Sequence, residues 1–124
     1  EIYMGDWSSD VCSSDLYFLG EILLSTQRLS EAEAVLAASM NRWKRSGAPP
    51  WRAARSASAL GEALYRQGRT DEAEKYLSES FRELTADSTA DAPAKEKARE
   101  RFERYVRKPS QRLSTSVSKD IAAQ

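Results

Sequence analysis

One short pattern occurs twice in this chain, and its repetition constrains the fold more than any other feature. Leu19-Gly20-Glu21 returns as Leu60-Gly61-Glu62, at an offset of 41 residues from Gly20 to Gly61. At the same offset, Glu31-Ala32-Glu33 aligns with Glu72-Ala73-Glu74 without a gap. Several matches at one shift indicate an internal repeat, in which each copy is a supersecondary unit that stacks on the next.

Within each copy the apolar residues have helical spacing. In the second copy, Leu60 and Leu64 mark one helix, and Ala73 and Leu77 mark the next. Gly68 lies between them and suits the left-handed conformation that ends many helices. The sequence therefore predicts an all-α fold of tandem antiparallel helical hairpins.

Glycine also lies inside the first predicted helix of each copy, at Gly20 and Gly61. Glycine in a helix interior costs about 1 kcal/mol relative to alanine. We expect a neighbouring helix to approach these two positions closely, which gives a reason for glycine there despite its cost. Ser30 with Glu33, and Asp71 with Glu74, predict a capping box at the start of each second helix.

The order of small and large residues resembles the tetratricopeptide repeat over about residues 17–84, with Leu60-Gly61 in the first helix and Ala73, Leu77 and Ser80 in the second. The resemblance implies an α-solenoid whose first helices line a concave, peptide-binding face. Three departures are visible: Ala57 stands where the family has an early Trp, Gln27 replaces the turn glycine in the first copy, and the family's late Pro is missing.

We expect five segments along the chain. Residues 17–47 and 51–85 form the two hairpins, residues 93–108 form a capping helix, and residues 109–124 form either a loose helix or a disordered tail. Residues 1–16 have no apolar periodicity, and Asp6 to Leu16 back-translates to a sequence resembling a short-read sequencing adapter. We expect them to be an adapter-derived, disordered artefact, with a genuine N-terminal segment as the alternative.

Composition argues against catalysis. The chain has no His and a single Cys, which leaves neither the commonest general base nor a cysteine metal site, and 19 basic residues balance 19 acidic ones. We expect no enzyme activity, no cofactor and no metal. We also expect no nucleic-acid partner and no membrane segment in these residues, and a cytoplasmic location is weakly favoured. Trp43 and Trp51 near Arg residues fit packing between hairpins better than base stacking.

Charged side chains recur on the first helices and form the candidate partner-binding site. Glu21, Glu62 and Glu103 are related by the repeat offset, and Tyr65, Arg66 and Arg107 follow one turn later. These residues could form a polar ladder that binds a segment of a protein partner. Alternatively, Glu62 with Arg66 and Glu103 with Arg107 are solubilising pairs worth about 0.2–0.5 kcal/mol each. The glutamates disfavour the clamp by which some family members hold a C-terminal carboxylate.

Two functions follow from these observations. The first is a protein-interaction scaffold that belongs to a larger protein with tetratricopeptide repeats. The alternative is the non-catalytic C-terminal regulatory region of a bacterial eukaryotic-like serine/threonine kinase, which the stretch from Pro50 to Pro109 resembles more loosely.

Overall fold

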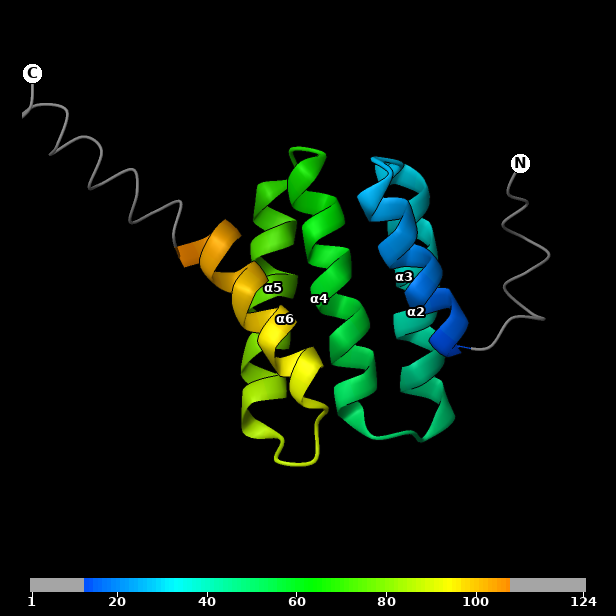
Figure 1. Cartoon of the computed structure of the whole chain (residues 1–124), viewed down its shortest axis with the longest axis vertical. Helices are drawn as coiled ribbons and strands as arrows, with labels where there is room; N and C mark the ends of the chain where they lie inside the picture. The colour runs from blue at the N-terminus through cyan, green and yellow to red at the C-terminus, as the bar shows by residue number, and fades with distance from the viewer. Residues whose placement is uncertain (1–12, 108–124) are drawn as a thin grey trace, which may run out of the picture.

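Two helical hairpins stand side by side, and a fifth helix packs across the second one (Figure 1). The computed structural model describes residues 13–107, with helices α2 (Ser13–Ser25), α3 (Leu29–Ser46), α4 (Pro50–Arg66), α5 (Thr70–Ala86) and α6 (Ala92–Phe102), followed by one π-helical turn, η1 (Glu103–Arg107). These residues contain no strand. The predicted all-α architecture of tandem hairpins is confirmed.

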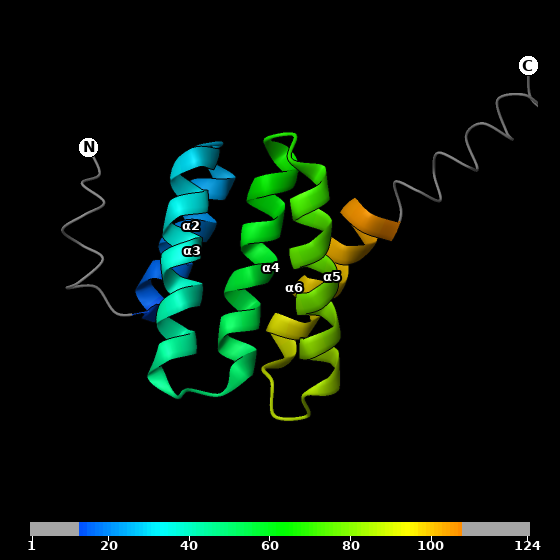
Figure 2. The same ribbon diagram turned by 180° about the vertical axis from the view of Figure 1, so that it is seen from behind.

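The helices form two layers. The first helices of the hairpins, α2 and α4, lie with α6 on the side that faces the viewer in Figure 1, whereas α3 and α5 lie on the side seen in Figure 2. We call the first surface the α2–α4–α6 face. Helix α4 is central, because it packs against α3 on one side and α5 on the other.

Close packing inside each hairpin depends on the two interior glycines. A Cβ atom placed on Gly61 would lie 2.7 Å from Leu77 Cγ, and one on Gly20 would collide with Leu36 in the same way. Leu36 and Leu77 are fully buried. The glycine at each position therefore allows a leucine of the second helix to lie against the backbone of the first.

The core runs through both hairpins and is extended by a smaller cluster under α6. Buried apolar residues from α2 to α5 form one continuous group, and a second group of Ala54, Leu84, Ala94 and Ala98 joins α4, α5 and α6. Between the hairpins, the hydroxyls of Ser39 and Ser56 form a buried hydrogen bond of 2.9 Å. This bond satisfies both polar groups where the two hairpins meet.

Three turns use left-handed backbone. Gly68 has φ 91° and Gly47 has φ 79°, as expected for glycine after a helix. Gln27, which replaces the turn glycine in the first copy, adopts φ 66° as well. Its side chain accepts a hydrogen bond from Arg66 at 2.7 Å, so a contact with the second hairpin accompanies the less favourable backbone conformation.

The capping-box prediction was wrong. Neither α3 nor α5 has a side-chain hydrogen bond at its N-terminal cap, where Arg28 and Arg69 stand. Both helices begin before the predicted serine and aspartate. Arg28 instead pairs with Glu31, and Arg69 pairs with Glu72 at 2.8 Å, so an ion pair spans the first turn of each helix.

Some expected boundaries also shift. Helix α2 begins at Ser13 rather than at residue 17, and Leu16 is fully buried in the core, so a disordered segment up to residue 16 is too long. Helix α6 begins at Ala92 and passes into the π-helical turn at Glu103. The predictions for residues 1–12 and for 108–124, which include the tail 109–124, lie outside the described residues. Within residues 13–107, no helix is long and apolar enough to cross a membrane.

The contact at Gly61 generates a stability prediction. Gly61→Leu places a branched side chain where Leu77 already lies, so we expect the free energy of unfolding to fall by about 1–3 kcal/mol or more. Thermal and urea unfolding followed by circular dichroism measures the change. Lys75→Leu adds the same side chain at an exposed position of α5 and serves as the control. Equal stability of the two variants would show that the hairpin packing is wrong.

Candidate functional site

The candidate residues are distributed over three elements of the α2–α4–α6 face. Glu21 lies on α2, Glu62, Tyr65 and Arg66 lie on α4, and Glu103 lies in η1. Arg107 ends η1, and its side chain lies outside the described part of the chain. Glu21 and Glu62 are brought together, but the residue that joins them is one that the sequence did not single out.

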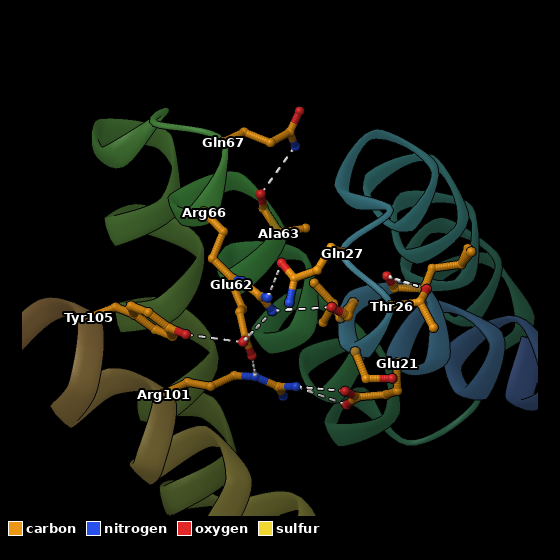
Figure 3. A network of polar contacts seen from close by, with 12 residues as sticks. Glu21, Thr26, Gln27, Glu62, Ala63, Arg66, Gln67, Arg101 and Tyr105 are labelled. Atoms are coloured by element: carbon orange, nitrogen blue, oxygen red, sulfur yellow. Dashed lines mark hydrogen bonds and ion pairs between the residues drawn. The ribbon is translucent and has the colours of Figure 1, made fainter.

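That residue is Arg101 of α6, whose side chain is only 4% exposed (Figure 3). Its Nε donates to Glu62 Oε1 at 2.7 Å, and its Nη2 donates to the two carboxylate oxygens of Glu21 at 2.8 and 3.0 Å. A longer contact of 3.4 Å joins its Nη1 to Ser58 Oγ. One guanidinium therefore connects α6 to both α4 and α2.

The Glu62 carboxylate accepts hydrogen bonds from three side chains. Besides Arg101, it accepts from Arg66 Nη1 at 3.1 Å and from the Tyr105 hydroxyl at 3.0 Å. Tyr105 also packs against Tyr65, with ring centroids 4.8 Å apart. The carboxylate is thus saturated by its own chain, so its substitution would report on folding as well as on binding.

Glu21 and Arg66 extend the network across the first hairpin. The Tyr17 hydroxyl donates to Glu21 at 2.5 Å, and burial together with this carboxylate raises the pKa of Tyr17 above its ordinary value. Arg66 also donates to the Leu24 carbonyl at 3.3 Å and to Gln27. The expected pair of Glu62 and Arg66 forms, but it is half-buried and connects two hairpins rather than only solubilising one helix.

The predicted ladder of three glutamates is incomplete. Glu103 lies 3.5 Å from Arg99 in an ion pair along its own segment. Arg101, two residues earlier, occupies the space between those two carboxylates. A cation is favourable between Glu21 and Glu62, because a third carboxylate in this partly buried row would repel both of them.

A sequence signal for Arg101 did exist. Ala94, Ala98, Arg101 and Tyr105 follow each other at spacings of four, three and four residues, which is the spacing of a helix face that packs against a partner. An arginine within such a stripe predicts a buried cation, and a buried cation needs carboxylates nearby. The carboxylates of Glu21 and Glu62, on the first helices of the two hairpins, were the candidate partners for this cation.

The local electrostatics favour the charged forms. Burial by itself raises the pKa of the Glu62 carboxyl, but the charge of Arg101, its hydrogen bond and that of Tyr105 outweigh burial and hold this pKa below its ordinary value of 4.5. For Arg101, burial lowers the pKa, and the carboxylates of Glu21 and Glu62 reverse this effect and raise it. Arg101 and Glu62 are therefore both charged near neutral pH.

A polar hollow of about 310 Å³ opens over this network. Its lining combines the paired residues with exposed charged side chains of α6, namely Glu21, Leu24, Ser25, Glu62, Arg66, Lys97, Glu100, Arg101 and Arg104. Within residues 13–107, no group of His, Cys, Asp and Glu side chains is arranged to hold a metal ion. The polar and charged groups that line the hollow can form hydrogen bonds and ion pairs.

The lowered pKa of Glu62 predicts a dependence of stability on pH. A carboxyl whose pKa is lower in the folded state stabilises the fold above its unfolded pKa, and this contribution is lost as pH falls through the folded pKa. We expect the free energy of unfolding to decrease as pH is lowered from about 5 to about 3, and to decrease less in Glu62→Gln. Urea unfolding at a series of pH values measures both slopes. Identical slopes would contradict the coupling of Glu62 to Arg101.

Comparison with known proteins agrees with this architecture. A family model of the tetratricopeptide repeat matches residues 11–82, which is more than half of the chain. The match begins inside the segment expected to be foreign, whose origin stays a prediction. No match was found among curated proteins or among solved structures. With its two hairpins, its glycine-to-leucine contacts and this match, the chain belongs to the tetratricopeptide repeat family.

Proposed function

We propose that this chain is a protein-interaction module that binds a segment of a partner protein on the α2–α4–α6 face. Repeats of this family typically serve as scaffolds for protein binding, and the internal hydrogen bonds of this face support the same role here. The single observation that carries the proposal is the Arg101 network. It holds three helices in one arrangement and leaves charged side chains exposed above it.

Exposure separates the structural residues of this face from those available to a ligand. The side chains of Arg101, Glu62 and Glu21 are 4%, 13% and 21% exposed, and Arg101 pairs with both carboxylates. Lys97, Glu100 and Arg104 line the same hollow and are exposed. A partner would therefore contact the α6 side chains, while the paired residues keep the face rigid. A rigid face loses little conformational entropy on binding.

We further propose that the module works within a longer array of hairpins. Phe18 and Ile22 on α2 are large apolar side chains that are 54% and 57% exposed. Their equivalents in the second copy, Ala59 and Ala63, are fully buried on α4, which packs against the preceding hairpin. This apolar edge of α2 suits another hairpin, since each repeat buries its faces against its neighbours. Phe18 and Ile22 also line the groove towards α6, so such a hairpin would border that groove.

The kinase-tail alternative is a statement about a larger protein, and it stays a prediction. No contact of the described residues favours it over a scaffold.

Selection of peptides from a displayed random library tests the proposed face. We expect the selected peptides to bind the wild-type chain and to lose affinity roughly tenfold for Arg104→Glu, since a reversed charge at an interface costs more than 1 kcal/mol. Lys75→Glu, which reverses an exposed charge on α5, should bind as wild type does. Fluorescence anisotropy measures the affinities, and circular dichroism verifies folding. Peptides that lose affinity for Lys75→Glu but not for Arg104→Glu would place the interaction on the opposite layer and overturn the proposal.

A further inference from the structure

A second arginine on this face is half-buried yet lacks an acidic partner. Arg55 lies on α4, with its guanidinium carbon 4.1 Å from the ring centroid of Tyr17, and 5.4 and 5.7 Å from those of Trp51 and Phe18. Its Nε is buried and has no hydrogen-bond partner. Within residues 13–107 it forms no ion pair. The aromatic rings hold the cation in place but leave hydrogen-bonding capacity unused.

The electrostatic surroundings of Arg55 are unfavourable for a cation. Burial lowers the pKa of its guanidinium, and the neighbouring Arg52 acts in the same direction. Glu21 and Asp91 favour the charged form from a distance, but the oxygens of Glu21 already accept from Arg101 and Tyr17. An additional anion beside Arg55 would therefore stabilise its charged guanidinium, which the other groups of the chain compensate poorly.

Arg55 lines an open groove with a second unpaired cation. The groove has a volume of about 490 Å³, and its lining residues come from α2, from Arg55 of α4 and from the start of α6. Lys97 lines it from α6, is exposed and forms no ion pair within the described residues. Tyr17, Phe18, Pro93 and Ala94 supply apolar walls. The groove adjoins the polar hollow, since Glu21, Ser25 and Lys97 line both.

We propose that this groove binds an acidic side chain of an extended peptide segment, with its carboxylate held by Arg55 and Lys97 and an adjacent apolar side chain packed on the groove walls. The inference rests on the proposed function and names the class of segment that the face accepts. Arginine presents two parallel donors to a carboxylate, which makes it the stronger of the two contacts. Alternating side chains of an extended segment point to opposite sides, which suits a groove with one apolar wall and one basic wall.

The same cations could in principle meet a phosphate, but the groove favours a protein ligand. Glu21 and Asp91 line it, and Glu100 lines the adjoining hollow. A nucleic acid carries one negative charge on every phosphate, so its backbone would face these carboxylates along the face. A peptide can place one carboxylate at Arg55 and neutral residues elsewhere. The expectation that glutamates on this face would repel a carboxylate also weakens, because Arg101 and Arg66 neutralise Glu21 and Glu62.

A pair of defined peptides tests the inference. The first is a short fluorescent peptide of alternating leucine and glutamate with blocked ends, and the second has glutamine in place of glutamate. We expect the wild-type chain to prefer the acidic peptide roughly tenfold, as a charge-assisted hydrogen bond predicts, and to lose the preference in Arg55→Gln. Lys97→Gln should reduce it several-fold, and Lys75→Gln should leave it unchanged. Lys97 is exposed, so this variant keeps the test valid if Arg55→Gln fails to fold.

The possible outcomes separate this inference from the proposed function. If library-selected peptides bind the α2–α4–α6 face but Arg55→Gln and Lys97→Gln both retain the wild-type preference between the defined peptides, the groove assignment is overturned while the interaction module stands. Equal affinity of the wild-type chain for the acidic and amide peptides overturns it as well. Stronger competition by a single-stranded oligonucleotide than by the acidic peptide would reassign the groove to phosphate. A shift of the Arg55 Nε–H resonance on addition of the acidic peptide alone supports the assignment directly.

Discussion

The ion pair of Arg101 with Glu21 and Glu62 is the interaction on which the arrangement of the α2–α4–α6 face depends. A guanidinium that is 4% exposed is tolerated in a protein interior only when carboxylates compensate it. Here the two carboxylates come from helices of different hairpins, and the cation comes from a third element. The position of α6 is therefore defined by its alanine packing on α4 and α5 and also by a contact that reaches α2.

Backbone proximity makes this contact possible. Gly20 and Gly61 let leucines of α3 and α5 lie against the first helices, and the hydrogen bond of Ser39 with Ser56 joins the hairpins through small side chains. The first helices are consequently near enough for one arginine to span both. The resulting face is organised before any ligand arrives, which is the property that an interaction module needs to bind at low entropic cost.

The sequence predicted the hairpins well, because short-range spacing and the repeat offset carry that information. Gly61 and Leu77 were identified as packing positions, and the structure brings them into contact. Local capping was predicted less well. Arg28 and Arg69 form ion pairs at the helix starts, whereas the predicted capping boxes involve only serine, aspartate and glutamate.

The candidate site was predicted in part. Glu21 and Glu62 were found from the offset. The helix-face spacing marks Arg101 as a buried position, but Arg101 was missed because its partners lie 80 and 39 residues away and no local pattern pairs them. The offset misled at Glu103, since the third segment departs from the repeat: Phe102 replaces the interior glycine and stacks on Phe81 at 4.7 Å. Arg55 escaped notice for a related reason. Its lack of an acidic partner is a property of three-dimensional surroundings and has no sequence signature.

A double-mutant cycle between Arg101 and Glu21 measures the central claim most directly. Free energies of unfolding of the wild type, Arg101→Met, Glu21→Gln and the double variant give the coupling between the first helix and the last. We predict a coupling of about 1 kcal/mol or more, because the pair is buried and links separate helices. Effects that add to within about 0.3 kcal/mol would show that Arg101 does not hold the face together and would contradict the account.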